Sequence, residues 1–439
     1  MYLATLRRYF KKSWLGIPLG VWLIAGIALA LKVTFLMTYQ NGRFLKEVVR
    51  ASDGHHYYAL AKNMLTGKGY VLWNHPSSYR PPLYPLILVL SFFTFDYSIV
   101  AVRFIQTVLS AVTCLMMYIL GKESVNERIG FLSALFTMLY FRFTFWSIYI
   151  LTETLYIFLS VLTITFLISA LKGTSRFRFF MTGILWGITF LCRPEFGGFL
   201  VFVLGYMALR EGILTKAFMQ RASLLVIGTL IAIAPWAIRN ALVHHAFILG
   251  TTTFGTQLYG GNSPYTTGGT DGWASVGVDY DFPPGIKPNR MPEVECQSIL
   301  VKEALQYIRE NPGRIVRIWP RKLLNFYRIY PSTASLRHKI FMGFQDGFLY
   351  VFTLIGTVVA FRRYPLARLF FLYGVFYTIL ITLLISELRY RFYITPFWIV
   401  LAAVGFDAVS GLFRKKKKAR ANTSSFHVMT ANEAVEISR

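Results

Sequence analysis

The sequence contains few cysteines and few charged residues. Only three of its 439 residues are cysteine, Cys114, Cys192 and Cys296, and their spacing fits neither a disulfide framework nor a zinc knuckle. Charged residues make up 15% of the chain and hydrophobic residues 55%, which is typical of a protein with many membrane spans and not of a soluble one. The apolar runs are continuous and do not alternate with polar residues, so we expect an all-α polytopic membrane protein.

Acidic residues are the scarcer of the two charged classes. The chain has 20 of them against 46 lysines and arginines, which gives a formal net charge of +26. The basic residues form short clusters between apolar runs and do not cover one face of a soluble domain, so the charge does not indicate nucleic-acid binding. Lys and Arg retained in cytoplasmic loops produce this pattern.

The apolar blocks predict the topology once one of them is set aside. Residues 82–95 would rise only about 21 Å as a helix, which is too short for a span, and we expect this block to be half-inserted at the outer side. Ten crossings then place every basic loop and both termini in the cytoplasm. The predicted spans are residues 15–37, 98–121, 129–150, 152–171, 178–192, 196–210, 222–241, 345–361, 366–385 and 391–412.

This topology divides the chain into a membrane domain, two large outer loops and two short cytoplasmic ends. The block at 15–37 is too long for a signal-peptide core and lacks a small-residue cleavage site, so we expect it to be retained. The tail is basic and then polar, which predicts disorder. The predicted parts are a cytoplasmic N-terminus 1–14, a transmembrane domain 15–412, a first outer loop 38–98, a large outer loop 242–344 and a cytoplasmic tail 413–439.

The first outer loop is dense in ionisable and aromatic side chains. Asp53 precedes a helix-like stretch, so it can cap that helix, accept a proton from a substrate hydroxyl, or do both. His55 and His56 would point to different sides of that helix, and at most one can share a site with Asp53. Arg80, before a Pro-Pro pair, either snorkels to lipid phosphate or holds a substrate phosphate.

Other outer segments add charges on the same side of the membrane. Glu153 starts an apolar run, where a carboxylate also meets a helix N-terminus favourably. Arg193 and Glu195 flank a proline and either pair with each other or serve a site. Arg389 and Arg391 lie outside, against the positive-inside trend, and an anionic ligand is the simplest reason. The large loop contains a Gly-rich segment suited to sugar binding and an amphipathic helix near residues 293–310.

These residues occur in an order that resembles a known family. The first-loop Asp53, YRPPLYPL, TETLYIF, the run from IRNALVHHAF to LYGGN, ENPGRIV and ELRYRFYITPF are similar to segments of the GT-C membrane glycosyltransferases. Within that superfamily the chain resembles relatives of the protein O-mannosyltransferases and of the lipid A aminoarabinose transferase. The resemblance runs from about residue 10 to 412 and implies a GT-C fold with ten or eleven transmembrane helices and juxtamembrane helices in the first loop.

The resemblance also implies an activity and roles for residues. A sugar would be transferred from a polyprenyl-phosphate donor to a glycan, lipid or protein acceptor at the outer face of the cell membrane, with inversion. A divalent cation remains open, and no other cofactor is expected. The resemblance assigns catalysis to Asp53 and Glu153 and the donor phosphate to Arg80. Because they lie in the predicted outer segments, we further expect Arg193, Arg389 and Arg391 at the donor phosphate, and His55, His56, Tyr57, Tyr79, Glu195, Tyr259, Asn262, Glu387 and Tyr390 in substrate binding.

Two other functions remain as alternatives. A transporter or flippase of lipid-linked sugars would show internal repeats and charges near mid-membrane. The sequence has no clear repeat, and its charges collect at one face. An O-antigen polymerase or ligase would depend on arginines and histidines of a long outer loop instead of an aspartate in the first loop.

Overall fold

The computed structural model describes residues 13–39, 53–268, 289–330 and 335–413, together with Pro283 and Ile286. These parts of the chain are helical apart from two short antiparallel hairpins. The first joins β1 (Ser13–Trp14) to β2 (Ile17–Pro18), and the second joins β3 (Val71–Leu72) to β4 (His75–Pro76). The prediction of an all-α protein is therefore confirmed. Residues 1–12 and 414–439, in the two predicted cytoplasmic ends, lie outside the described residues.

Seven of the described helices are long and apolar enough to cross a membrane. Three further helices are shorter: α7 (Glu127–Leu139) packs on α6, α10 (Arg176–Cys192) on α12, and α11 (Phe196–Glu211) on α18. Whether each of these three crosses remains open, so ten crossings stay a prediction. The seven are α2 (Leu19–Thr38), α6 (Ile99–Ser124), α9 (Glu153–Lys172), α12 (Lys216–His244), α17 (Leu336–Arg363), η1 (Pro365–Ala367) continued by α18 (Arg368–Leu383), and the last helix (Leu388–Phe413).

The block at 129–150 is not one helix, and that prediction was wrong. Helix α7 ends at Leu139, and α8 (Arg142–Ser147) follows after a break. At the break, the Tyr140 hydroxyl donates to Asp346 Oδ1 at 2.6 Å and the Arg142 guanidinium donates to Asp346 Oδ2 at 2.8 Å. The chain leaves the helical path here because two polar side chains reach a buried carboxylate, which a hydropathy pattern does not show.

The short apolar block and the large loop have their own helices. Helix α5 (Leu83–Thr94) has 12 residues and rises about 18 Å, which agrees with a block too short to cross. The large loop contains α13 (Phe254–Gly261), α15 (Glu293–Glu310) and α16 (Pro312–Tyr327). The predicted loop 242–344 also includes the end of α12, which continues to His244, and the start of α17 at Leu336, so its bounds stay a prediction.

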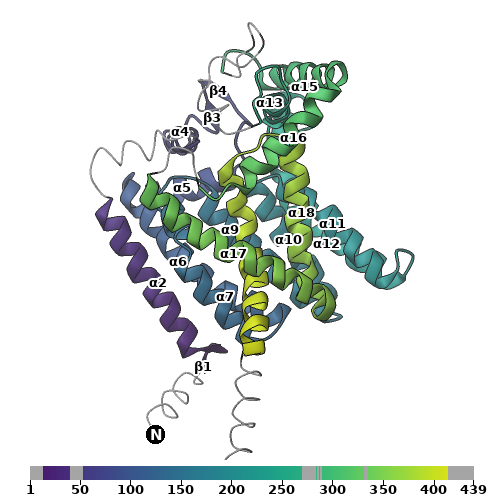
Figure 1. The fold of residues 1–439 in the computed structure, drawn as a ribbon. Coiled ribbons are helices and arrows are strands. Elements are labelled where there is room, and N and C mark those ends of the chain that lie inside the picture. Colours follow the sequence, from purple (N-terminus) through teal and green to yellow (C-terminus); the bar gives the residue numbers. More distant parts are fainter. Residues whose placement is uncertain are drawn as a thin grey trace, which may run out of the picture.

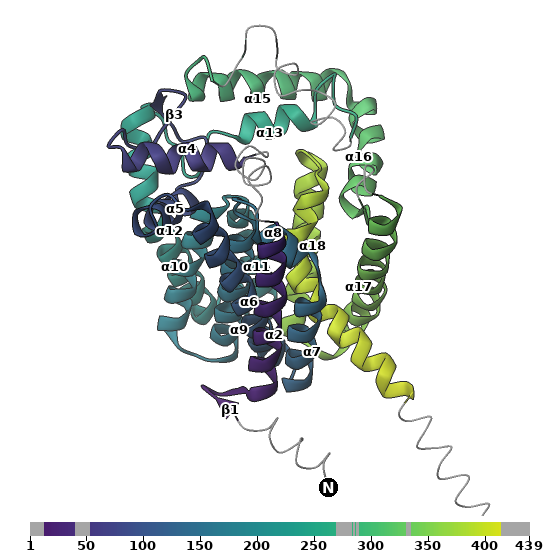
Figure 2. The same cartoon turned by 90° about the vertical axis from the view of Figure 1, so that its left-hand side faces the viewer.

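The predicted inner and outer loops gather at opposite ends of the bundle. At one end, Lys172 pairs with Glu123 at 2.8 Å and Arg128 with Asp407 at 2.8 Å. Figure 2 shows β1 and the end of the last helix at this end, whereas α4 (Gly54–Leu65), β3, α13 and α15 form a cap at the other. The grouping of the loops into two sets agrees with the charge pattern, and which set faces the cytoplasm remains a prediction.

Helix α9 lies at the centre of the bundle (Figure 1) and begins with Glu153, one of the predicted catalytic residues. Most of its side chains are buried, and the Tyr156 hydroxyl is 2.7 Å from that of Tyr373 and 2.6 Å from that of Tyr377. These contacts fix α9 against α18, so Glu153 at the start of α9 is held at the cap end of the core.

Candidate active site

Asp53 precedes α4 but does not cap it. Its backbone is already helical, with φ −80° and ψ −10°, and its side chain makes no capping hydrogen bond. Instead, Asp53 Oδ1 accepts from an Arg80 Nη at 2.6 Å, and Oδ2 accepts from an Arg389 Nη at 3.2 Å. The capping interpretation of Asp53 is therefore wrong, and the carboxylate joins two arginines that are far apart in the sequence.

Arg80 lies in the segment between β4 and α5, and four aromatic side chains of the first loop surround it. Its guanidinium carbon is 5.6 Å from the Tyr57 ring centroid and 5.0 Å from that of Tyr79. The Tyr70 hydroxyl donates to the Arg80 carbonyl at 2.9 Å, and an Arg80 Nη donates to His56 Nδ1 at 3.1 Å. Because Nδ1 accepts, the neutral His56 ring carries its proton on Nε2.

Arg389 reaches Asp53 from η2 (Leu388–Tyr390), the short 3-10 turn that opens the last helix. Its Nε also pairs with Glu387 Oε2 at 2.5 Å. Each arginine thus has a polar partner besides Asp53. The side chains of Asp53, Arg80 and Arg389 are between 15% and 20% exposed, so the cluster is partly screened from water.

The arginines determine the protonation states of this cluster. Burial alone would raise the pKa of the Asp53 carboxyl, but the Arg80 and Arg389 guanidiniums bring that pKa well below its usual range. Burial and the charge of Arg80 lower the pKa of His56 to about 2. The cluster therefore consists of an ionised carboxylate, two cations and a neutral imidazole at any pH near neutrality.

A buried glutamate, which the sequence did not single out, ties the Arg80 segment to the large loop. Glu293, at the start of α15, accepts from Ser77 Oγ at 2.5 Å through Oε1. Its Oε2 accepts from the Ser78 backbone N–H at 2.9 Å and from Thr252 Oγ1 at 2.6 Å. With both oxygens bonded and 4% of the residue exposed, Glu293 holds the chain three residues before Arg80 in place.

Glu153, Arg193 and Glu195 form a second charged group, beside Tyr393. Glu153 is 1% exposed; its Oε1 accepts from the Tyr393 hydroxyl at 3.1 Å, while its Oε2 has no partner among the described residues. An Arg193 Nη pairs with Glu195 at 2.8 Å, so the two residues pair with each other, which was the predicted alternative to a role in the site. Another donates to Thr152 Oγ1 at 3.0 Å, and the guanidinium carbon lies 4.3 Å from the Tyr393 ring centroid.

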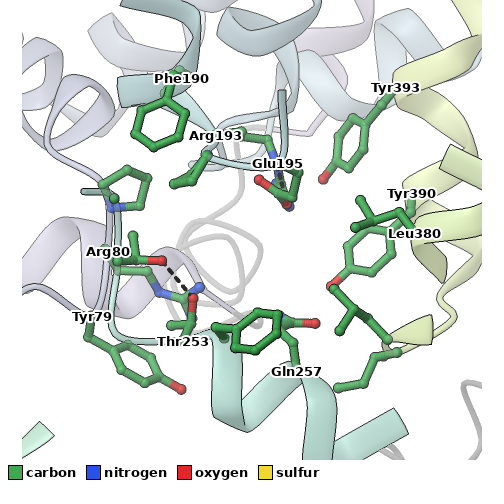
Figure 3. A pocket seen from close by; sticks show the side chains of 18 of the residues that line it. Tyr79, Arg80, Phe190, Arg193, Glu195, Thr253, Gln257, Leu380, Tyr390 and Tyr393 are labelled. Carbon is green, nitrogen blue, oxygen red and sulfur yellow. Dashed lines mark hydrogen bonds and ion pairs between the residues drawn. The ribbon is translucent and has the colours of Figure 1, made fainter. Parts of the chain in front are cut away.

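A cavity of about 310 Å³ adjoins both groups. Figure 3 shows Arg80 and Tyr79 on one side of it, Arg193 and Glu195 on another, and Tyr390, Tyr393 and Leu380 across from Arg80. One wall is apolar and comes from the end of α18, with Leu380, Ile381, Leu384 and Ile385. The cavity can therefore take an amphipathic ligand, with its polar part against the arginines and its apolar part toward α18.

Several cavity residues were not among the predicted site residues. They have neutral side chains without a distinctive pattern, although some stand within sequence segments that had been recognised as unusual. Tyr393 belongs to ELRYRFYITPF, and Thr251 to Gln257 belong to the run before LYGGN. The added cavity residues with polar or aromatic side chains are Phe190, Thr251, Thr253, Phe254, Gln257, Tyr377 and Tyr393.

Arg391 is two residues from Arg389 but does not join Asp53. One Nη of Arg391 pairs with Asp346 Oδ2 at 2.6 Å, and the other donates to the Tyr350 hydroxyl at 2.5 Å. The residue is 2% exposed and does not line the cavity. The structure therefore does not bring Arg391 to the predicted phosphate site, because Arg391 forms an ion pair with a buried carboxylate on α17.

Three further predicted substrate residues lie away from the cavity. Tyr259 packs beside Cys296 and Leu300 in the small core between α13 and α15. Asn262 donates to the carbonyls of Leu258 at 2.9 Å and Leu383 at 2.7 Å, which fixes the end of α18. His55 is exposed, whereas His56 is buried at Arg80, as expected for neighbouring helix positions.

The described residues do not fit a metal site. No group of three or more His, Cys, Asp and Glu side chains among them could hold an ion. Both oxygens of Asp53 are engaged by guanidiniums, and dedicated sites need three or four ligands. We therefore assign no step to a divalent cation.

Comparisons with known proteins show which family part of the chain resembles and which solved structures share its fold. Residues 79–238, less than half of the chain, match the model of a family described as dolichyl-phosphate-mannose-protein mannosyltransferase. A comparison with curated proteins finds no match.

Among solved structures, the apo oligosaccharyltransferase of Archaeoglobus fulgidus aligns with a TM-score of 0.56 and 14% identity, over 94% of this chain and 52% of that one. The same organism's AglB, solved with an inhibitory peptide and a dolichol-phosphate, aligns with a TM-score of 0.51 and 13% identity, over 83% and 47%. This chain thus spans about half the length of the archaeal enzyme. ArnT of Cupriavidus metallidurans bound to undecaprenyl phosphate has 12% identity over 86% and 77% of the chains, but its TM-score of 0.37 carries no argument.

These findings confirm the resemblance to the GT-C superfamily. The family match covers the Arg80 segment, Glu153, Arg193 and Glu195, and the structural match extends the fold over nearly the whole chain. The chain is an all-α membrane protein with the GT-C fold, similar over residues 79–238 to the dolichyl-phosphate-mannose-protein mannosyltransferases.

Proposed function

We propose that the protein is a membrane glycosyltransferase that moves a sugar from a polyprenyl-phosphate donor to an acceptor hydroxyl, with inversion at the anomeric carbon. The observation that carries the proposal is the Asp53 carboxylate between Arg80 and Arg389, beside a cavity that is polar at one wall and apolar at another. The family match and the dolichol-phosphate in AglB support a lipid-phosphate donor.

The two arginines are the proposed site for the donor phosphate. A guanidinium binds phosphate oxygens through two parallel N–H groups, and both guanidiniums are partly exposed. The polyprenyl chain would follow the apolar wall at the end of α18, which is itself a candidate membrane span. The sugar would then meet the aromatic and neutral polar part of the cavity, which includes Tyr390, Gln257 and Thr253.

The reaction is a displacement in one step. Asp53 accepts the proton of the acceptor hydroxyl, whose oxygen forms a bond to the anomeric carbon. The bond from that carbon to the phosphate oxygen breaks on the opposite face, and its electron pair leaves with polyprenyl phosphate. The leaving group gains negative charge, which Arg80 and Arg389 stabilise without giving up a proton.

The location of the reaction follows from the two ends of the bundle. The proposed site lies at the cap end, opposite the end where the basic loops gather. Retention of basic loops in the cytoplasm would place the site at the extracytoplasmic face of the cell membrane and both termini inside. The acceptor would then be an envelope glycan, a lipid or a protein.

Mass spectrometry of envelope glycans tests this proposal in cells. A strain without the protein, complemented with the wild type, should regain one sugar that the Asp53→Asn strain lacks, because loss of a general base reduces rates about 10²-fold or more. Asp96→Asn is the matched control: Asp96 has φ +43°, and Asn tolerates this region well. Equal glycan profiles with Asp53→Asn and wild type would end the assignment of Asp53. An unlinked sugar moved across the membrane would favour a transporter.

A further inference from the structure

While both guanidiniums contact Asp53, its carboxylate cannot act as an efficient base. Each carboxylate oxygen accepts from a guanidinium, at 2.6 Å from Arg80 and 3.2 Å from Arg389. These ion pairs stabilise the charged form of the carboxylate, so a proton transferred to it is strongly disfavoured. A general base works best when its pKa lies near the working pH. The contacts that hold Asp53 in place therefore make its carboxylate a weaker base.

The same two guanidiniums are also the proposed ligands of the donor phosphate. Arg193, which lines the cavity together with Arg80, already donates to Glu195 and Thr152. A phosphate that approaches Arg80 and Arg389 therefore competes with Asp53 for them.

Each arginine has a second partner that can keep it in position during such a competition. Arg80 donates to His56 Nδ1 at 3.1 Å, and the His56 ring is packed edge-on against Trp73 and Tyr79 at 5.2 and 5.6 Å. Arg389 is held by Glu387 at 2.5 Å. Both guanidiniums can therefore release Asp53 without leaving the site.

We propose that the donor phosphate takes Arg80 and Arg389 from Asp53 and so frees this carboxylate to receive the acceptor proton. The inference rests on the proposed function, and it makes donor binding the step that activates the base. The acceptor hydroxyl is then deprotonated only when a donor is present, which keeps the enzyme from presenting an active base to water alone.

The exchange also accounts for the reset of the site after transfer. A sugar linked to polyprenyl phosphate carries one negative charge, and the released polyprenyl phosphate carries up to two. The charge lost when Asp53 is protonated thus appears on the leaving phosphate, still between the arginines. When the phosphate departs, Arg80 and Arg389 return to Asp53 and drive its proton into water.

Other charged and titratable groups around Asp53 do not replace the arginines. His56 stays neutral, since burial and Arg80 lower its pKa to about 2. Tyr57 stays protonated, since burial raises its pKa to about 12. Glu153 and Arg193 contribute charge from α9 and the segment after α10, and Glu387 is paired with Arg389. Within the described part of the chain, none of these three forms an ion pair with Asp53, whose partners are Arg80 and Arg389.

Calorimetry with undecaprenyl phosphate tests the exchange without a sugar or an acceptor. The full-length protein in nanodiscs is titrated near pH 6 in buffers of different ionisation enthalpy, which gives the protons bound with the ligand. Wild type and Asp96→Asn should take up more protons than Asp53→Asn, by up to about one per site. Because Asp53 competes for the arginines, Asp53→Asn should also bind the probe about tenfold more tightly, the scale of one charged hydrogen bond.

The outcomes separate this inference from the proposed function. Equal proton uptake and equal affinity in wild type and Asp53→Asn, with transfer lost in the variant, would overturn the exchange and leave the function standing. Failure of wild type to bind undecaprenyl phosphate, or normal transfer by Asp53→Asn, would overturn both. Tighter binding with lost transfer and lost proton uptake is the result we expect. Equal thermal midpoints of the three proteins would show that the variants are folded.

Discussion

The buried group around Asp346 gives a prediction whose size follows from the structure. Asp346 on α17 is fully buried and accepts from Arg391 at 2.6 Å, Arg142 at 2.8 Å and Tyr140 at 2.6 Å. Asp346→Asn keeps the shape of the side chain and removes its charge, which leaves two buried guanidiniums without an anion. It would weaken the contacts that α17 makes with Arg142 on α8 and with Arg391 on the last helix, and it leaves the contacts of Arg389 with Asp53 and Glu387 in place.

The expected cost is large compared with that of a surface ion pair. Removal of one member of a buried charged group costs about 3–5 kcal/mol of stability, because an uncompensated charge remains. The matched control, Asp407→Asn, breaks a pair with Arg128 whose side chains are 48% and 30% exposed. Its expected cost is about 0–1 kcal/mol, since water screens such pairs.

Thermal unfolding of the purified protein in detergent, followed by tryptophan fluorescence, measures both variants. We expect a clearly lower midpoint for Asp346→Asn and little change for Asp407→Asn. Any Asp346→Asn enzyme that remains folded should keep the apparent KM for the donor, since Arg391 does not line the cavity. An unchanged midpoint together with a raised donor KM would refute the structural role and return Arg391 to the phosphate site.

Three further predictions concern the site itself. Arg389→Ala should raise the apparent KM for a polyprenyl-phosphate donor about tenfold and leave the KM for the acceptor nearly unchanged. Arg389→Lys should recover part of the loss, because lysine restores the charge but not the two parallel N–H groups of the guanidinium. An unchanged donor KM would count against phosphate binding. Arg80 and Arg389 lower the pKa of Asp53, so the pH profile of kcat/KM for the donor, which reports the free enzyme, should show no acidic limb from Asp53 above about pH 4. The profile of kcat/KM for the acceptor, measured at saturating donor, should show such a limb. Acidic limbs at the same pH in both profiles would contradict the exchange at Asp53. Glu293→Gln should destabilise the Arg80 segment by about 1–3 kcal/mol and reduce transfer. The glutamine NH₂ group would replace one carboxylate oxygen and face hydrogen-bond donors that now lack an acceptor. A wild-type midpoint of unfolding and a wild-type transfer rate would show that the hydrogen bonds of Glu293 are dispensable.

Charge and hydropathy allowed much of the site to be predicted from the sequence. Charge counting placed Asp53, Arg80 and Arg389 on one side of the membrane domain, and the structure brings these three side chains into contact. That inference worked because ionisable residues are costly in a membrane protein, so those at one face are few. Helix geometry also distinguished His55 from His56, because neighbouring side chains of a helix point in different directions.

The remaining details depend on long-range contacts that no local pattern contains. Arg389 and Arg391 have the same residue type and sit two positions apart, and only the position of Asp346 on α17 decides which of them meets Asp53. The same carboxylate interrupts the apolar block at 129–150. Glu293 lies in the first turn of an amphipathic helix, where an acidic residue is common, but its partners Ser77 and Ser78 lie more than 200 residues away in the first loop.

The interpretation of Asp53 as a cap failed for a related reason. Asp before a helix is a good N-cap by propensity, and that preference is worth about 1 kcal/mol. Contact with two guanidiniums is worth more in a partly buried site, so the side chain turns away from the helix N-terminus toward Arg80 and Arg389. A local preference gave way to a stronger tertiary interaction.

The central claim is that this protein transfers a sugar from a polyprenyl-phosphate donor and that Asp53 carries the reaction. The most direct measurement uses purified protein in proteoliposomes with radiolabelled polyprenyl-phosphate sugars and extracted envelope acceptors, and follows the labelled acceptor and free polyprenyl phosphate together. We predict equal amounts of both products with wild type and a loss of about 10²-fold or more with Asp53→Asn, but not with Asp96→Asn. Transfer that proceeds at the wild-type rate in Asp53→Asn would contradict the account.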